Sequence, residues 1–198
     1  MRSPLLSIRL LLMIRSVALS VMLGLTATTV TAAEPPVLVE WQDFRSNLYR
    51  SANIIIAGQP LSEAAMQKLK AEGISTIVNL RTPHEMKNRE STPIAEAQLA
   101  NLLAIDYHHL PAGGPDYPYT PATVTAFNSI VQNAQGTVFL HCNSARRATH
   151  LWVAWLNQHQ GLPIDEAITL GRQANFGGMP LEGFMDRPLT VNTESVAD

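Results

Sequence analysis

The sequence predicts an α/β domain in which helices cover both faces of a mainly parallel central sheet. Apolar strand-like runs alternate with helix-like segments between residues 53 and 173. Connections between parallel strands are right-handed crossovers, which place the intervening helices against the faces of the sheet. The chain has 198 residues, which is enough for one ordinary domain beside a short leader.

The first 33 residues have the layout of a secretory signal. Arg2, Arg9 and Arg15 precede or flank an apolar run over 17–30, and the segment ends in small residues at Ala32 and Ala33. The alternative is an uncleaved anchor, but Arg15 leaves fewer than the roughly 20 apolar residues that span a bilayer. We therefore expect a signal peptide over 1–33, cleavage, no stable membrane insertion afterwards, and a periplasmic or secreted location.

The mature chain is expected to be one domain over 34–198, with its core at about 47–175. Removal of the signal leaves 11 basic and 16 acidic residues, a formal net charge of −5. Nucleic-acid binding depends on clustered Lys and Arg side chains that neutralise phosphates, and the sequence has no such cluster. A nucleic-acid partner is therefore not expected.

The elements follow from local patterns. The β-branched run 53–57 is a strand, the turn at Gly58 leads to Ser62 as N-cap of a helix over 63–72, and 75–80 is a second strand. A polar loop over 81–90 precedes a helix over 93–104, since Pro93 suits a first helical turn. The remaining elements are a strand over 106–110, a Gly/Pro-rich loop over 111–120, a helix over 121–134, a strand over 137–141, and helices over 148–160 and 163–173.

The single cysteine lies where such a fold binds ligands. Cys142 directly follows the last apolar strand and precedes a helix, and parallel sheets bind ligands at the carboxyl ends of their strands. A helix N-terminus carries about half a positive charge and, with a nearby guanidinium, can lower the pKa of a thiol from about 8.5 to between about 3.5 and 7.5. Arg147 offers a planar fork of donors for a tetrahedral oxyanion.

A cysteine that closes a core strand is by default a small buried hydrophobe. Three neighbouring features favour the reactive alternative instead. His141 precedes the cysteine, small polar residues follow it, and an arginine stands at the helix start. None of these is needed by a packed strand end.

The run from His141 to Arg147 resembles the active-site loop of the tyrosine/dual-specificity phosphatase superfamily. It is most similar to the bacterial branch that includes the beta-lactamase-hydrolase-like, phosphatase-like domain. The resemblance covers roughly 47–160 and includes Leu48-Tyr49-Arg50, Gly58-Gln59-Pro60, Gly73-Ile74, Ile77-Val78-Asn79-Leu80-Arg81, Tyr107 and Leu110-Pro111. It implies a phosphatase-like fold with the Cys-Arg loop between the last core strand and a helix, a phosphorylated protein or small molecule as substrate, and no cofactor.

The resemblance also implies the roles of individual residues. Cys142 would attack phosphorus, Arg147 would bind the phosphate oxygens, His141 would orient the loop, and the hydroxyl of Thr149 would help to release the phosphocysteine. The phosphate-binding loop would comprise Asn143, Ser144, Ala145, Arg146 and Arg147.

Two features of the loop depart from the usual superfamily pattern. Four residues separate Cys142 from Arg147 instead of five, a length shared by this branch and by rhodanese sulfurtransferases. Gly or Asn stands in relatives where Ala145 stands here, and alanine tolerates a left-handed backbone poorly. Arg146 as the anion binder would shorten the loop further, so we prefer Arg147.

A general acid is also required, because a leaving alkoxide or phenolate needs a proton. Asp116 in the Gly/Pro-rich loop lies where the superfamily places its acid, and the alternative is a solvated turn residue. Asp106 is a weaker second choice.

Other polar residues receive simpler interpretations. His108 and His109 are adjacent in a strand and point to opposite faces, so they do not predict a metal site. Arg81 and Glu85 are interpreted as members of a polar loop rather than of the pocket.

Three functions from different classes remain open. The first is a cysteine-dependent phosphatase that hydrolyses a phosphomonoester through a phosphocysteine. The second is a rhodanese-like sulfurtransferase, which the short loop favours. The third is a non-catalytic oxyanion- or phosphate-binding protein, since Ala145 departs from the pattern and an exported low-pKa thiol is easily oxidised.

Overall fold

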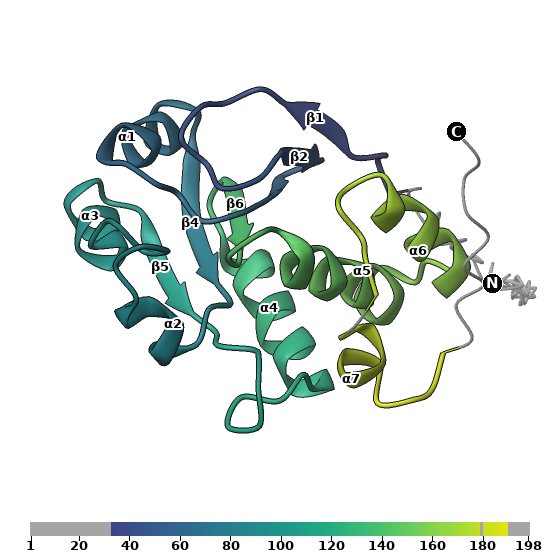
Figure 1. Ribbon diagram of the computed structural model, residues 1–198. Coiled ribbons are helices and arrows are strands. Elements are labelled where there is room, and N and C mark those ends of the chain that lie inside the picture. The colour runs from purple at the N-terminus through teal and green to yellow at the C-terminus, as the bar shows by residue number, and fades with distance from the viewer. Residues whose placement is uncertain (1–32, 179, 190–198) are drawn as a thin grey trace, which may run out of the picture.

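A six-stranded mixed sheet forms the centre of the computed structural model, which describes residues 33–178 and 180–189 (Figure 1). The strand order is β1-β2-β3-β6-β4-β5. Strands β3, β6, β4 and β5 are parallel, whereas β1 and β2 extend the sheet through antiparallel pairs. The strands are β1 (Val37–Val39), β2 (Leu48–Ser51), β3 (Ile54–Ala57), β4 (Ile74–Asn79), β5 (Asp106–His109) and β6 (Thr137–His141). The predicted mainly parallel sheet is confirmed.

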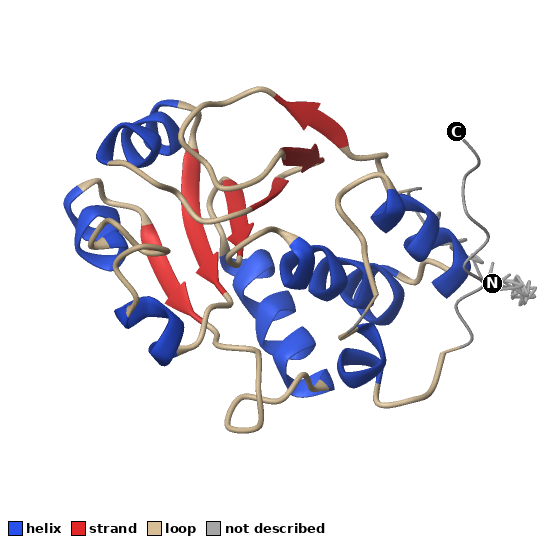
Figure 2. Ribbon diagram, in the orientation of Figure 1, coloured by secondary structure: helices blue, strands red, loops and turns tan. Residues whose placement is uncertain are grey.

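Helices pack on both faces of this sheet, as predicted (Figure 2). Successive side chains of a strand point to opposite faces, so Ile54 and Ile56 join one apolar cluster while Ile55 and Ala57 join the other. The first cluster includes residues of α4 (Pro121–Asn133), α5 (Arg146–Gln160), α6 (Ile164–Arg172) and α7 (Leu181–Met185). The second includes residues of α1 (Glu63–Ala71) and α3 (Glu96–Leu102).

Some elements differ from the prediction. The short strands β1 and β2 were not expected, and α2 (Pro83–Lys87) interrupts the loop predicted over 81–90. Thr82 and Glu85 form a capping box around α2 with Pro83 in its first turn, which satisfies the free amides of so short a helix. Helix α3 begins at Glu96 rather than at 93, and α5 begins at Arg146 rather than at 148.

The centre of the sheet sets the position of the cysteine. Strand β6 lies between β3 and β4, and His141 is opposite Ala57 on one side and Asn79 on the other. The carboxyl ends of these three parallel strands therefore meet directly below Cys142, the position where α/β sheets bind ligands. Among the described residues, no helix is long and apolar enough to cross a membrane.

Candidate active site

The loop from Cys142 to Arg147 turns the chain from β6 into α5. Ala145 is the N-cap of α5 and adopts the left-handed conformation, with φ 65° and ψ −20°. The backbone amides of Asn143 and Ser144 donate no hydrogen bond within the described part of the chain. Together with the free amides of the first turn of α5, they can receive an anion above the sulfur. Cys142 itself is only 1% exposed.

A glycine at the end of β3 permits this loop to lie against the sheet. The amide of Gln59 donates to the carbonyl oxygen of Asn143 at 3.1 Å. A side chain at Gly58 would come within 2.8 Å of that same oxygen and within 2.7 Å of the hydroxyl of Ser46. Only glycine allows this approach of the two backbones.

Arg147 is held in a fixed orientation by acceptors on three segments. Its Nη1 donates to the carbonyl oxygens of Leu80 (3.2 Å) and Ala112 (2.8 Å) and to Oε2 of Glu85 (2.9 Å). Its Nη2 donates to Oε1 of Glu85 at 2.5 Å, so the carboxylate is bound in a bidentate manner. The Nε–H and one Nη2 hydrogen make no hydrogen bond with the described residues, and they form the edge available to an oxyanion.

The Glu85–Arg147 pair is charged on both sides. Burial alone would raise the pKa of Glu85, but hydrogen bonds from Arg147 and from the backbone of Thr82 bring it below its usual value. Burial would likewise lower the pKa of Arg147, and the hydrogen bonds to Glu85 with the nearby charge of Cys142 raise it instead. The guanidinium thus stays positive beside the cysteine.

The interpretation of Arg81 and Glu85 as a merely polar loop was wrong. Arg81 is 1% exposed and binds Gln59, Ser91 and Thr92 with its Nη1. It ties the carboxyl end of β4 to the turn after β3 and to the segment before α3. Glu85 could have been found from the capping box around Thr82, which fixes its place at the end of β4.

The imidazole of His141 lies below the cysteine. Its Nδ1 is 3.2 Å from the carbonyl oxygen of Cys142, and its Nε2 is 2.7 Å from Oε1 of Glu96 in α3. Both side chains are fully buried. The orienting role that the resemblance implied for His141 stays a prediction, and Glu96 was not foreseen.

A segment after α6 packs against the outer side of the loop. Asn175 donates from Nδ2 to the carbonyl oxygen of Ser144 at 2.6 Å. The hydroxyl of Thr149 contacts the carbonyl oxygens of Ala174 (2.5 Å) and Ala145 (3.1 Å). Thr149 is fully buried and its hydroxyl is engaged by main-chain acceptors, so its predicted role in phosphocysteine release gains no support from these contacts.

Known proteins resemble this chain in sequence and in fold. The model of the family described as beta-lactamase hydrolase-like protein, phosphatase-like domain, matches residues 43–159, more than half of the chain. The chain belongs to this family.

Curated relatives of this phosphatase-like domain are beta-lactamase hydrolase-like proteins. That of Agrobacterium fabrum is 34% identical over 100 residues, which are 50% of this chain and 22% of the relative. That of Xylella fastidiosa is 28% identical over 123 residues, which are 62% of this chain and 28% of the relative. The chain thus spans less than a third of the length of these relatives.

Solved phosphatase structures share the fold of the domain. A putative phosphatase from Neisseria meningitidis has a TM-score of 0.50 at 25% identity and covers 68% of this chain and 89% of its own. Tk-PTP in its active form has a TM-score of 0.55 at 16% identity, with 74% and 94% covered. Pseudomonas aeruginosa TpbA in complex with pTyr has a TM-score of 0.51 at 17% identity, with 77% and 83% covered.

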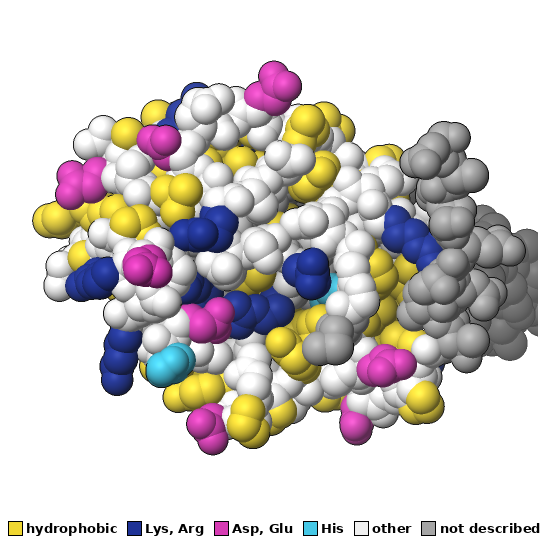
Figure 3. Space-filling view, viewed as in Figure 1, with side chains coloured by type: hydrophobic (Ala, Val, Ile, Leu, Met, Phe, Trp, Pro, Cys, Tyr) yellow, Lys and Arg dark blue, Asp and Glu magenta, His cyan; other side chains and the backbone are white. Residues whose placement is uncertain are grey.

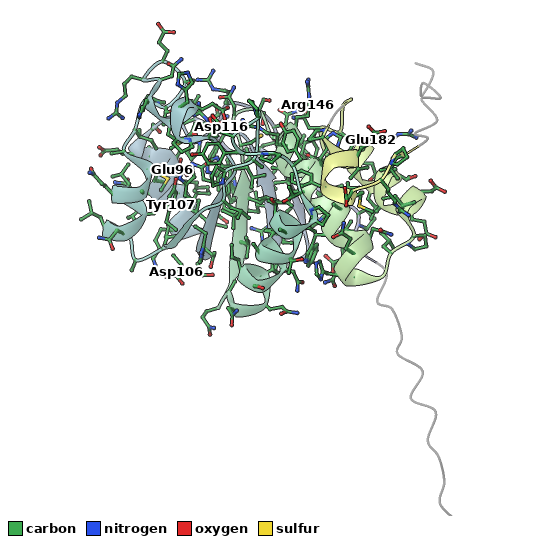
Figure 4. The ribbon with its side chains drawn as sticks, turned by 90° about the horizontal axis from the view of Figure 1, so that it is seen from below. Glu96, Asp106, Tyr107, Asp116, Arg146 and Glu182 are labelled. Carbon is green, nitrogen blue, oxygen red and sulfur yellow. The ribbon has the colours of Figure 1, made fainter. Side chains whose placement is uncertain are left out.

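Asp116 lies in the exposed loop between β5 and α4 of this phosphatase-like domain. The same loop touches the active site, because Ala112 accepts from Arg147 and a side chain at Gly113 would come within 2.9 Å of Nη1. In Figure 4, Asp116 lies on the same side of the molecule as Arg146, whereas Asp106 lies on the opposite side. No contact joins Asp116 to Cys142, and the assignment of Asp116 as the general acid stays a prediction.

The remaining predicted site residues belong to the anion-binding loop itself and differ in their exposure. Ser144 and Arg146 are exposed and Asn143 is half-buried. The described residues contain no cluster of three or more His, Cys, Asp or Glu side chains that could hold a metal ion. His109 binds the carbonyl oxygen of Arg81 at 2.6 Å, away from its neighbour His108.

Proposed function

We propose that the domain is a cysteine-dependent phosphatase that hydrolyses a phosphomonoester through a phosphocysteine intermediate. The observation that carries the proposal is the join of β6 to α5. There Cys142 and the free edge of Arg147 lie at the two ends of one loop whose amides of Asn143 and Ser144 are unpaired. Family membership supports it, as does the phosphatase fold of the structural neighbours.

The chemistry follows from these groups. The sulfur of Cys142 attacks phosphorus while the bond from phosphorus to the ester oxygen breaks, and a proton from Asp116 neutralises the leaving oxygen. Arg147 and the loop amides stabilise the charge on the three equatorial oxygens. Water then attacks the phosphocysteine, which releases inorganic phosphate and regenerates the thiolate.

The surface around the loop suits an anionic substrate. Figure 3 shows Lys and Arg side chains in the middle of the face that carries α2, α4 and α5, with acidic side chains mostly toward its edge. Exposed basic residues of α2, of the segment after it and of α5 are Lys87, Arg89 and Arg146, and exposed Arg45 donates to the carbonyl oxygen of Glu90 in that segment. A phosphorylated substrate can therefore approach the loop although the mature chain carries a net charge of −5.

The decisive experiment is a panel of phosphomonoesters assayed beside thiosulfate under reducing conditions. We expect weak but measurable release of phosphate, inhibited by vanadate or tungstate. Cys142→Ser should lose turnover yet bind tungstate, because the nucleophile is absent while the amides and Arg147 remain. Arg147→Ala should lose both. Full activity of Cys142→Ser would exclude this loop from the mechanism.

Two other functions are separated by the same assay. The four-residue loop favours a sulfurtransferase, which would form thiocyanate from thiosulfate and cyanide through a persulfide on Cys142. The left-handed alanine favours a binding protein, which would bind tungstate but release phosphate from no ester. Either result would replace the phosphatase proposal.

A further inference from the structure

Tyr119 is a second hydrogen-bonding side chain beside the anion-binding loop over 142–147. It is half-buried and lies just before α4, at the end of the loop that follows β5. A side chain at Gly113 would lie 2.9 Å from Nη1 of Arg147 and 3.7 Å from the hydroxyl oxygen of Tyr119. The two polar atoms are therefore at most about 6.6 Å apart, because both distances start from the same position. A single oxyanion can bind to both residues.

The ring of Tyr119 is fixed by contacts with α7. Its centroid lies 5.2 Å from that of Phe184 in an edge-to-face arrangement, which is a favourable geometry for two aromatic rings. Helix α7 also packs closely on the backbone here, since a side chain at Gly183 would come within 2.8 Å of Cβ of Tyr119 and within 3.0 Å of its carbonyl oxygen. These contacts orient the phenol without involving its hydroxyl.

The hydroxyl of Tyr119 has no hydrogen-bond partner in the described part of the chain. It is not one of the enclosed polar atoms that lack a partner, so its oxygen is open to solvent. Tyr107 provides the contrast, because its buried hydroxyl accepts from Nδ2 of Asn79 at 2.8 Å. The hydroxyl of Tyr119 is therefore available to a bound ligand.

The charged groups of the site act on the phenol of Tyr119. Burial raises its pKa above the ordinary value of 10.0, and the positive charge of Arg147 lowers it by less. The negative charges of Cys142 and Glu85 add to the rise. The phenol therefore keeps its proton at neutral pH and can donate a hydrogen bond. A donor beside a guanidinium suits an anionic ligand.

We propose that Tyr119 is a substrate-binding residue whose hydroxyl donates a hydrogen bond to a non-bridging oxygen of the bound phosphoryl group, beside the guanidinium of Arg147. Because α7 already fixes the ring, little conformational freedom is lost when the hydrogen bond forms. The inference deepens the proposed function and rests on it for the ester substrate. The contact with an oxyanion can be tested with tungstate, which needs no turnover.

The first test measures tungstate binding by calorimetry. Tyr119→Phe removes the hydroxyl and keeps the ring beside Phe184, and we expect it to raise the dissociation constant about tenfold, as for one hydrogen bond to a charged group. Tyr117→Phe is the matched control, because Tyr117 is an exposed tyrosine of the same loop, and it should bind tungstate as the native protein does. Unchanged affinity of Tyr119→Phe would overturn the proposal.

Thermal melts exclude a structural role of this hydroxyl. Both variants should have the Tm of the native protein, because the hydroxyl of Tyr119 bonds to no described residue. A fall in Tm of Tyr119→Phe that accounts for its loss of binding would assign the hydroxyl to the fold and overturn the proposal.

The second test observes the phenol directly by NMR. The chain has four tyrosines, so labelling with ¹³C at Cζ gives four signals, and that of Tyr119 is identified by its loss in Tyr119→Phe. Tungstate should shift this signal, because a hydrogen bond to the anion changes the charge on the phenol oxygen. The signal of Tyr49 in β2 should not move. A Tyr119 signal that saturating tungstate leaves unshifted would overturn the proposal.

Kinetics distinguish this role from that of a general acid. We expect kcat/KM of Tyr119→Phe to fall by the same factor for alkyl and for activated aryl phosphates, because both have the non-bridging oxygens. A loss confined to alkyl phosphates, with tungstate binding intact, would assign the hydroxyl to the leaving oxygen and overturn the proposal.

The outcomes also separate this inference from the proposed function. Weaker tungstate binding by Tyr119→Phe, in a protein that hydrolyses no ester, would leave the contact with the oxyanion standing and remove the phosphatase. A native protein that binds no tungstate would remove both proposals.

Discussion

Ala145 adopts a backbone conformation that alanine disfavours. Its substitution by glycine affects the free energy of unfolding in two opposite ways. The left-handed conformation costs a residue with a Cβ about 1–2 kcal/mol. Ala145 is also fully buried, so Ala145→Gly would lose a methyl group that contributes about 0.8 kcal/mol. We expect the unfolding free energy of Ala145→Gly to change by less than about 1 kcal/mol, measured by urea denaturation.

Ala104 offers a matched control. It also has a positive φ, 50°, but its side chain is exposed, so Ala104→Gly relieves the strain without losing a buried methyl. Ala145→Val should by contrast destabilise the fold by about 2 kcal/mol or more and weaken tungstate binding, because a β-branched side chain is both strained and overpacked there. A stable Ala145→Val variant would contradict the left-handed conformation.

His150 makes the stability of the domain depend on pH. Burial lowers the pKa of His150 to about 4 from 6.5, outweighing its hydrogen bond to the carbonyl of Gly177. The unfolded chain therefore binds more protons between these values, and the unfolding free energy falls as pH decreases from 6.5 toward 4. The loss amounts to at most about 3 kcal/mol.

The variant His150→Gln should flatten this part of the profile, as measured by chemical denaturation at pH 4 to 7. An unaltered slope in His150→Gln would assign the proton uptake to other groups.

The sequence identifies the candidate nucleophile and the candidate anion-binding arginine, but not the residues that contact them. Cys142 and Arg147 are close in the chain and lie at a strand-helix junction, so local patterns suffice to find them. Glu85 is 62 residues from Arg147, and Asn175 is 31 residues from Ser144. Such contacts form only when whole helices and strands pack together, and a local sequence pattern does not predict which distant residues will meet. In the sequence, Glu96 likewise looks like any polar residue of a helix. Its position beside His141 is evident only from the packing of α3 against the sheet.

At the scale of elements, the loop over 111–120 is predicted to supply the general acid, Asp116. Asp116→Asn should slow the hydrolysis of alkyl phosphates far more than that of activated aryl phosphates, since only poor leaving groups need a proton in the transition state. The measurement is kcat/KM for both substrate types in the two proteins. Asp106→Asn, on the opposite side of the molecule, should change neither rate (Figure 4). Equal losses for both substrates in Asp116→Asn would indicate a role in binding or folding.

Strand β6 was predicted at its observed bounds because 137–141 is a strongly apolar run, and α5 was predicted from its apolar spacing with a start two residues too late. Strands β1 and β2 have three and four residues and lie outside the parallel core, and burial in β2 is only partial. Strand β2 pairs with β3 and β1 pairs with β2, so both strands depend on this pairing rather than on a strong pattern of their own. Helix α2 has five residues and no buried side chain, so it has no apolar face to detect.

At the scale of the whole molecule, the export signal and the extent of the mature domain stay predictions, and most of the signal segment lies outside the described residues. We expect the protein recovered from an extracytoplasmic fraction to begin at about residue 33 or 34, since cleavage follows Ala32 or Ala33. N-terminal sequencing is the measurement. An intact Met1 on a membrane-bound form would contradict the prediction.

The anion-binding loop is braced by Gln59 from before it in the chain, by Glu85, and by Asn175 from after it. The ribosome therefore adds the cysteine to the chain before it adds the last of these contacting residues, Asn175. At that stage the nascent chain contains Cys142 but not yet all of the residues that contact the loop. The loop completes its set of contacts only when the segment after α6 has been added, and a chain that ends before Asn175 lacks the hydrogen bond to Ser144.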